Sequence, residues 1–344
     1  MADVTIRGAG IFGLSIAWAC VLHGAKVTIV DPNGPGSGSS GGLVGALAPH
    51  TPENWNEKKE FQFQSLIAAE AFWKEVDETS GLSSGYARTG RLQPIASDQA
   101  LELAQQRSVN AQDLWRGAAS WSIVQAADFA PWAPCSETGL LIYDTLTARM
   151  HPRLASASLV AALASRGVTV QQEASDQGKV IWATGYRGLE ELSIERGRLV
   201  GAGIKGQSAL LEFEARDMPQ LFADALHIVP HENGTVGIGS TSEREFDDPS
   251  STDHLLEDVL HRAIEAFPVL TNARVIERWA GVRPRAKSRA PMLGEHPFKA
   301  GQFIANGGFK IGFGMAPKVA QVMADLVLNN VDAIPESFRP SASL

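Results

Sequence analysis

The most constraining feature of this chain is a glycine-rich turn near its start, Gly8-Ala9-Gly10-Ile11-Phe12-Gly13. A short apolar stretch at residues 2–7 predicts a strand before the turn, and residues 11–23 predict a helix after it. Glycines with this spacing allow a tight turn, the close approach of a pyrophosphate, and close packing of the helix on the strand. The helix then points free N–H groups at the phosphates. The turn therefore predicts a dinucleotide site on a parallel sheet.

Asp31 supports this interpretation. It ends a second predicted strand at residues 26–30, which completes a strand–turn–helix–strand unit. A carboxylate at this point can hold the ribose hydroxyls of a bound dinucleotide. The motif alone does not separate NAD from FAD.

Residues 32–49 have the Gly, Ser and Pro content of a flexible linker. The segment ends, however, in the apolar stretch 43–48, and glycine lets a backbone lie close to a ligand. We therefore expect a loop that contacts the ligand. The segment also contains G-x-S-x-G around Ser40, but a nucleophile elbow needs a strand directly before the serine, and a Gly-Pro loop precedes this one. A serine hydrolase is therefore disfavoured.

Composition limits the class of protein. The 344 residues are 44% hydrophobic, which suits two modest domains. The formal net charge of −8 argues against a nucleic-acid partner or an anionic membrane. Two cysteines make neither a disulfide framework nor a zinc site, no signal peptide is recognisable, and the longest apolar run is shorter than the roughly 20 residues of a membrane span. These features predict a cytoplasmic protein with no membrane span.

Hydrophobic periodicity predicts the remaining elements. Helices are expected at residues 57–76, 98–111, 151–166, 251–266 and 315–328, and strands at 89–96, 168–171 and 180–183. Leu154, Leu159 and Leu163 are expected on the buried side of their helix. Residues 192–240 suggest a run of short strands, with Asn233-Gly234 as a hairpin turn.

Four further stretches carry a family resemblance. They are "SGGLVGALAPH" at 40–50, the apolar strand ending in A-T-G at 180–185, "WAGVRP" at 279–284 followed by "PMLG" at 291–294, and "NGGFKIGFGMAP" at 306–317. Together with the glycine turn they resemble the D-amino-acid oxidase/glycine oxidase superfamily of FAD-dependent enzymes, glycine oxidase most of all. The resemblance extends over residues 3–50, 151–190 and 225–330.

The resemblance implies an α/β fold with two domains. A discontinuous, Rossmann-like FAD domain would comprise residues 1–50, 151–205 and 275–344, and an antiparallel-sheet (α+β) substrate domain would comprise 51–150 and 206–274. The FAD would be non-covalent because residues 281–320 contain no cysteine, with His50 as the remote alternative for attachment. The implied FAD contacts are Gly8, Gly10, Ile11, Phe12, Gly13, Asp31, Ser39, Ser40, Gly45, Ala46, Leu47, Ala183, Thr184, Gly185, Gly281, Gly308, Phe309, Lys310, Ile311 and Gly312.

The resemblance also implies three residues that face the substrate. Arg283 matches the family arginine for the amino-acid carboxylate, and its planar fork of donors suits that group. Lys310 replaces a second arginine and would hold the carboxylate or lie near flavin N1 and C2=O. His227 stands where the family has tyrosine in "Y-I-V-P", so the usual substrate preference does not carry over. His231 lies four residues further on, but Pro230 forbids a helix between the two, so no metal site is expected.

The function implied is FAD-dependent oxidation of the C–N bond of a small amine or amino acid, of the glycine, sarcosine or D-amino-acid type, to an imine. Oxygen or another acceptor would reoxidise the flavin. Two alternatives stay open: demodification of carboxymethylaminomethyl-uridine in tRNA, which the loop at 40–50 favours and the acidic charge disfavours, and a flavin subunit of a multi-subunit dehydrogenase. The substrate, its stereochemistry, the acceptor, the oligomeric state and the role of residues 80–150 stay undetermined.

Overall fold

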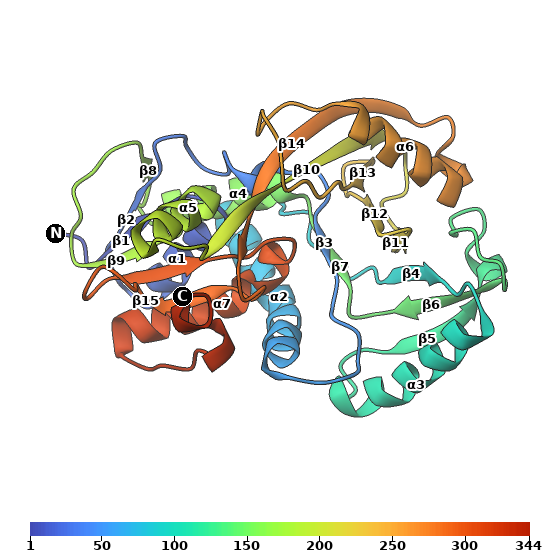
Figure 1. Cartoon of the computed structure of the whole chain (residues 1–344), viewed down its shortest axis with the longest axis horizontal. Helices are drawn as coiled ribbons and strands as arrows, with labels where there is room; N and C mark the ends of the chain where they lie inside the picture. The colour runs from blue at the N-terminus through green and yellow to red at the C-terminus, as the bar shows by residue number, and fades with distance from the viewer.

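The chain forms two large sheets at opposite ends of the molecule (Figure 1). We describe them from a computed structural model, which covers residues 1–344. A six-stranded sheet has the order β15-β16-β9-β1-β2-β8, and an eight-stranded sheet has the order β14-β10-β13-β12-β11-β4-β6-β5. The predicted mixed α/β class is confirmed.

The six-stranded sheet is parallel at its centre, where β1 pairs with both β2 and β9. Only β15 runs antiparallel, against β16. Its strands are β1 (Val4–Arg7), β2 (Val27–Val30), β8 (Val170–Gln171), β9 (Lys179–Trp182), β15 (Met292–Glu295) and β16 (Phe303–Asn306). The carboxyl ends of β1, β2, β9 and β16 therefore share one edge, which is where open α/β sheets bind ligands.

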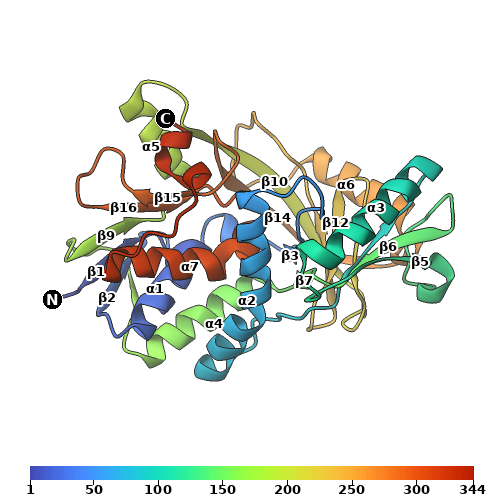
Figure 2. The ribbon, with the colours of Figure 1, turned by 90° about the horizontal axis from the view of Figure 1, so that it is seen from below.

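Four helices pack together beside this sheet, and Figure 2 shows them in one region of the molecule. α1 contacts both α4 and α7, and α2 lies against the same two helices. They are α1 (Ile11–Leu22), α2 (Glu57–Ser80), α4 (Pro152–Ser165) and α7 (Gly312–Asn329). α1 is apolar on nearly every side, so it is buried on nearly every side, and it belongs to a core cluster of 46 residues.

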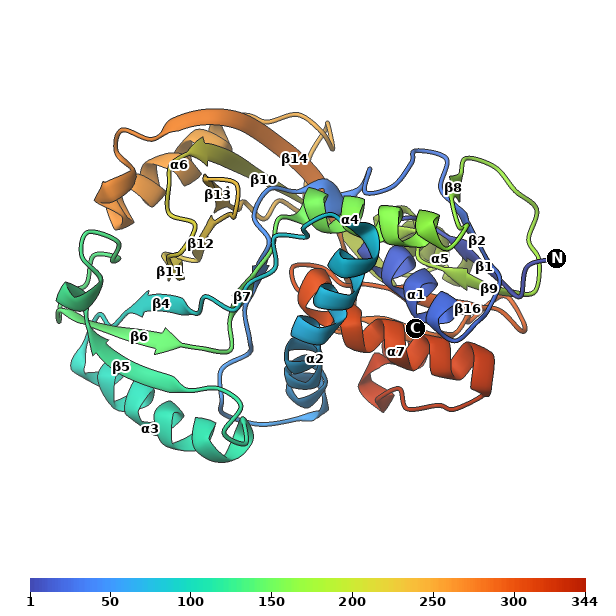
Figure 3. The same ribbon diagram turned by 180° about the vertical axis from the view of Figure 1, so that it is seen from behind.

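The eight-stranded sheet is antiparallel except where β4 meets β11. Its two long strands, β10 (Gly201–Glu212) and β14 (Arg274–Ala286), run from beside the first sheet to the far end (Figure 1). The others are β4 (Arg91–Pro94), β5 (Trp121–Gln125), β6 (Leu140–Asp144), β11 (Gln220–Ala223), β12 (Leu226–Pro230) and β13 (Thr235–Gly239). Helix α6 (His254–Ala266) covers one face through an apolar stripe. Helix α3 (Asp98–Leu114) lies against β5 (Figure 3).

Two local expectations are wrong. Residues 192–196 are not strand but the end of helix α5 (Gly185–Arg196), and the strands that follow include the 12-residue β10. Leu154 is 36% exposed, because only the face of α4 that carries Leu159 and Leu163 points into the core. The predicted hairpin at Asn233-Gly234 is confirmed, since it joins the paired strands β12 and β13.

The domain boundaries stay a prediction. Helix α2 falls in the range assigned to the substrate domain, yet it packs against α7 and α4. None of the helices is long and apolar enough to cross a membrane.

Candidate functional site

The glycine turn joins β1 to α1 and requires its glycines. Gly8 has a φ of +108°, and a Cβ there would lie 2.2 Å from the carbonyl oxygen of Ala183. A Cβ on Gly13 would lie 1.9 Å from the carbonyl oxygen of Gly8. No side chain fits at either position, so the turn can hold α1 close to the ends of β1 and β9 only with glycine.

The side chains of Asp31 and Ser40 both hydrogen-bond to the backbone of this turn. Asp31 Oδ2 accepts a hydrogen bond from the backbone N–H of Ala9 at 2.8 Å. Ser40 Oγ accepts one from the N–H of Ile11 at 2.9 Å, and Ser40 is buried. Ser39 and Ser40 belong to a short 3₁₀ helix, η1 (Ser39–Gly41). The Gly/Ser-rich segment is therefore an ordered loop that packs on the start of α1 and not a linker, and its contact with a ligand stays a prediction.

The other predicted cofactor segments converge on the same region. Ala183, Thr184 and Gly185 connect β9 to α5, next to Gly8. Gly308 lies against the Phe12 ring, since a Cβ there would be 2.9 Å from Phe12 Cζ.

The loop from Gly308 to Ile311 leads into α7, which begins at Gly312. Within that loop, Phe309 donates its backbone N–H to the carbonyl of Pro284 at 2.9 Å, which joins the last motif to the "WAGVRP" motif. Segments more than 270 residues apart in sequence thus meet around one sheet edge.

Gly45, Ala46 and Leu47 extend the loop toward the second sheet. Ala46 and Leu47 form β3 (Ala46–Leu47), which pairs with β7 (Ala148–Arg149). Leu47 also lies next to Gly314 of α7. His50 follows, and both its backbone N–H and its ring Nδ1 contact Gln62 Oε1. Gly281 lies on β14 opposite Gly206, beside the Trp279 ring.

Strand register decides which side chains face the site from the eight-stranded sheet. Directly paired residues share a face, and so do residues two apart along a strand. His227 pairs with Gly239, which pairs with Ser208. Gly206 and Ile204 lie two and four residues before Ser208 on β10, so they share its face, and Ile204 pairs with Arg283. His227 and Arg283 therefore lie on the same face, opposite the face that α6 covers. We call this the open face.

The Arg283 side chain extends along the open face from β14 to β10, where it passes over Gly206. A Cβ on Gly206 would lie 1.9 Å from Arg283 Nη2, so the guanidinium lies directly on the Gly206 backbone. Nη2 donates to Ser240 Oγ at 2.6 Å, and Nη1 donates to the carbonyl of Thr241 at 3.3 Å. Burial lowers the pKa of Arg283 to about 10, and the carboxylate of Glu243 opposes this shift. The group therefore stays charged near neutral pH without a hydrogen-bonded carboxylate of its own.

His227 is neutral at pH 7. Burial, and then the positive charges of Arg91 and Lys310, lower the pKa of His227 to about 3. Its Nδ1 is buried and has no hydrogen-bond partner, and its ring packs at a tilt of 45° on the Phe222 ring, with 4.6 Å between the ring centres. The ring can therefore give or accept a hydrogen bond, but it does not take up a proton near neutral pH.

Lys310 stands at the tip of the loop before α7, exposed to solvent. Partial burial of its ammonium, and then the charges of Arg283 and Arg285, lower the pKa of Lys310 to about 8. The N–H of Phe309, next to Lys310, bonds to the carbonyl of Pro284, next to Arg283, so the backbone holds the loop of Lys310 against the strand segment of Arg283. That Arg283, Lys310 and His227 face one substrate stays a prediction.

Comparison with known proteins identifies the family. The family model described as DAO: FAD dependent oxidoreductase matches residues 3–326. The chain belongs to this family. It is therefore an FAD-dependent oxidoreductase, and the expected family and cofactor are confirmed.

Its relatives span the whole chain. Glycine oxidase of Geobacillus kaustophilus is 24% identical over 94% of this chain and 92% of its own length. Glycine oxidase of Pseudomonas aeruginosa is 26% identical and covers 99% of both chains. In fold, the chain resembles iminodiacetate oxidase from Chelativorans sp. BNC1, with a TM-score of 0.84, 24% identity and 98% coverage of both chains.

The residues present suit FAD. Helix α1 has no cap from its N-cap residue Gly10 and no acidic residue in its first turn, and although Ser40 accepts the N–H of Ile11, the other N–H groups of the first turn and the positive potential stay available for a pyrophosphate. Helix α7 also starts without a cap or an acidic residue, directly after the loop of Lys310, which is expected near flavin N1 and C2=O. Such a helix start would favour negative charge on a flavin held beside it.

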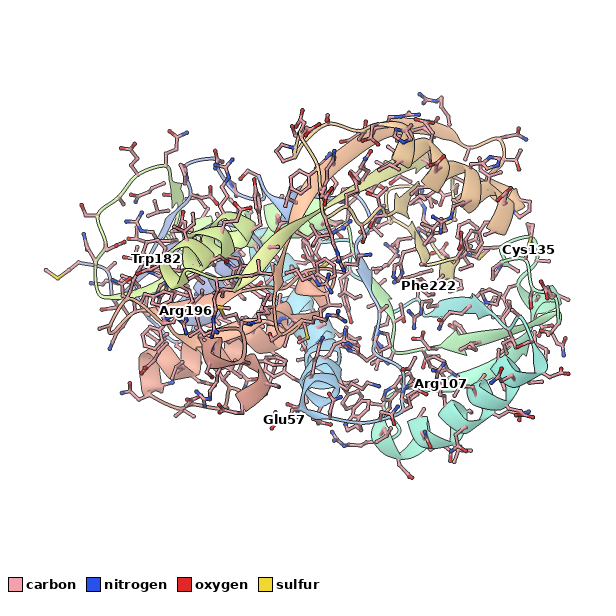
Figure 4. The ribbon with its side chains drawn as sticks, viewed as in Figure 1. Glu57, Arg107, Cys135, Trp182, Arg196 and Phe222 are labelled. Carbon is pink, nitrogen blue, oxygen red and sulfur yellow. The ribbon has the colours of Figure 1, made fainter.

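Sequence reasoning missed several residues of the open face. Gly206 lies inside a strand, and an isolated glycine in a strand is a signal of close backbone approach that could have marked it. Arg91 and Phe222 lie on β4 and β11, in parts of the chain without a motif, and only the strand pairing brings them beside His227. Figure 4 labels Phe222 on β11, near β4.

Proposed function

We propose that this enzyme oxidises the C–N bond of a small amine or amino acid, of the glycine, sarcosine or D-amino-acid type, to an imine. The observation that carries the proposal is Arg283: a half-buried, charged guanidinium on the open face, one residue from the Pro284 carbonyl that accepts the N–H of Phe309. Relatives named glycine oxidase and iminodiacetate oxidase support the same class of substrate.

The chain's own groups would bind and orient the substrate. Arg283 would hold the carboxylate, with Lys310 as a second cation beside it, and neutral His227 would hydrogen-bond the amine or the carboxylate. Bound FAD supplies the oxidation by accepting a hydride from the carbon that bears the nitrogen. The protein's contribution is position and electrostatics, and no general base is needed if the amine binds without its proton. Oxygen or another acceptor would complete the cycle.

We further propose that the FAD is non-covalent. Cys20 is buried, and burial raises the pKa of its thiol to about 12, while the exposed Cys135 bonds to the carbonyl of Glu265, across the eight-stranded sheet from the flavin segments. His50 is engaged by Gln62. Acid precipitation of the purified protein should therefore release all the flavin into the supernatant.

The deciding experiment is the visible spectrum of the purified protein, followed without oxygen while glycine, sarcosine, D-alanine, D-proline and iminodiacetate are added. We expect a flavin band near ~450 nm that at least one of them bleaches. In Arg283→Ala the band should remain and the bleaching should be lost. A flavin band that none of these amines bleaches would contradict the proposal.

A further inference from the structure

A second arginine faces the same region as Arg283, from the other half of the sheet. Arg91 on β4 pairs with Gln220 on β11, and two residues further along β11 Phe222 pairs with His227. All four side chains therefore lie on the open face. The Arg91 guanidinium lies 5.6 Å from the centre of the Phe222 ring, whose other neighbour is the His227 ring at 4.6 Å. Arg91, Phe222 and His227 thus form a continuous row.

Arg91 is buried, but only one nitrogen of its guanidinium has a hydrogen-bond acceptor in the chain. It is 5% exposed, and its Nε donates to Asp144 Oδ2 at 2.9 Å. The other oxygen of Asp144 is taken by the N–H and hydroxyl of Thr147. Neither terminal nitrogen of Arg91 has a hydrogen-bond acceptor in the chain. A buried arginine held by one nitrogen, with its two-pronged end free, has the geometry for a carboxylate.

Other polar atoms around Arg91 lack partners as well. Gln93 Nε2, Gln220 Oε1 and His227 Nδ1 are buried without a hydrogen bond, and Gln220 is fully buried. All three residues lie on the open face, next to Arg91 along β4 or across the strands. Buried polar groups in native proteins nearly always have partners, so these orphans indicate a polar ligand: Gln93 Nε2 can donate to an anion, whereas Gln220 Oε1 accepts and would need a donor such as the amine or a water. A donor such as Gln93 Nε2 beside a guanidinium suits an anion.

The charges on the open face point the same way. Arg91 has one carboxylate partner, Asp144, whereas Arg283 has none within hydrogen-bonding distance and Lys310 adds a further positive charge. A substrate with one carboxylate would pair with Arg283 and leave the terminal nitrogens of Arg91 without an acceptor.

We propose that the physiological substrate is an amine with two carboxylates: one binds Arg283, and the second binds the terminal nitrogens of Arg91 with Gln93 beside them. The inference rests on the proposed function, because it names the substrate class of the same site. It excludes glycine and sarcosine as preferred substrates. Phe222 and His227 would line the space between the two carboxylates, where the carbon–nitrogen backbone of the substrate lies.

The first test compares matched amines. The ratio of kcat/KM should be measured for iminodiacetate against N-ethylglycine, and for D-aspartate against D-2-aminobutyrate, since each pair differs chiefly in the second carboxylate. We expect at least one dicarboxylate to exceed its partner by about 100-fold, as a charged hydrogen bond at a buried site commonly contributes. Ratios near one in both pairs would overturn the inference and leave the proposed function intact.

The second test changes Arg91. Removing it alone would leave Asp144 buried and unpaired, so the main variant is the neutral pair Arg91→Gln with Asp144→Asn, and Arg91→Lys is the conservative variant. The ratio of kcat/KM for the dicarboxylate to kcat/KM for the monocarboxylate should fall at least tenfold in the double variant and by less in Arg91→Lys. The fall should come from a higher KM for the dicarboxylate. Arg278→Gln is the control, because Arg278 pairs with Glu257 of α6 on the opposite face of the sheet, and its ratio should stay at the wild-type value.

A binding measurement separates the two proposals. Succinate and butyrate contain no amine, so their dissociation constants, measured from the perturbation of the flavin spectrum, do not depend on turnover. Succinate should bind at least tenfold tighter than butyrate to the wild-type protein and lose that advantage in the double variant. If no amine is oxidised but this preference is present, the proposed function fails and the second carboxylate site stands. If succinate has no advantage, the second site is refuted.

Discussion

The two sheets of this protein build their parts of the site in different ways. The six-stranded sheet presents backbone groups: turns, helix starts and glycines at the ends of β1, β9 and β16. The eight-stranded sheet presents side chains, Arg283, His227, Phe222 and Arg91, which come from four strands and share a face only because of their register. We call the first group the cofactor half and the second the substrate half, after the roles proposed for them. The cofactor half is fixed by short local motifs, whereas the substrate half is fixed by pairing between distant segments.

The largest effect should follow a change in the cofactor half. Gly8→Ala would place a Cβ 2.2 Å from the Ala183 carbonyl at a φ of +108°, so β1, α1 and β9 must move apart. We expect loss of bound FAD, measured as the ratio of absorbance at ~450 nm to that of the protein.

The control for that change is Gly24→Ala, which has a φ of +81° but no atom within 4 Å of its Cβ. This variant should lose only about 1–2 kcal/mol of stability and keep its flavin. Equal flavin loss in both variants would mean that backbone strain, and not the close approach to Ala183, explains the Gly8 requirement.

A change in the substrate half should spare the flavin and impair substrate binding. Gly206→Ala would place a methyl group on the Arg283 guanidinium, so we expect a loss of about 100-fold in kcat/KM for a carboxylate substrate, similar to that of Arg283→Lys. The double variant should lose little more than either single variant, because both changes disturb one interaction. Additive losses would show that Gly206 acts independently of Arg283.

Acid should weaken the contact between the two halves. His231 is fully buried, its Nε2 bonds to the Leu43 carbonyl of the cofactor loop at 2.9 Å, and burial lowers the pKa of His231 to about 3. The unfolded chain binds a proton below about pH 6.5 and the folded chain does not until about pH 3, so stability falls as pH drops through this window. At pH 5 the loss from His231 alone is about 2 kcal/mol.

Urea unfolding at pH 7 and pH 5 measures this effect. The loss of unfolding free energy between pH 7 and pH 5 should be smaller in His231→Gln, which keeps a donor for the Leu43 carbonyl. It should equal the wild-type loss in His261→Gln, whose ring is exposed beside Glu265. Identical pH dependence in wild type and His231→Gln would contradict the assignment to His231.

The smallest expected effect concerns Lys310. Because its pKa is about 8, Lys310 loses its charge as the pH rises from 7 to 9, and a carboxylate should then bind about tenfold more weakly. A carboxylate without an amine, such as propionate, avoids the substrate's own titration. Its dissociation constant should rise above pH 8 in wild type and stay flat in Lys310→Arg. A rise of equal size in Lys310→Arg would assign the titration to another group.

Much of the cofactor half could be predicted from the sequence, since Gly8, Ser40 and Gly308 act within or beside the motifs that contain them. The sequence also points to Arg283 and Lys310, because each lies inside a family motif, and their roles at the site stay a prediction. Helix α5 was partly misassigned, because its polar surface gives little helical periodicity, and its position is decided by packing on β10 and β14.

The sequence by itself determined the dinucleotide turn, the order of most elements and the family, because these depend on residues that are close together along the chain. Only the tertiary structure decided that Arg91, Phe222 and His227 form one row, and that His227 is neutral with a pKa of about 3. The physical reason is that strand register and burial are properties of pairings between distant segments, such as Arg91 with Gln220, 129 residues apart, and Ile204 with Arg283, 79 residues apart, and no local pattern encodes them.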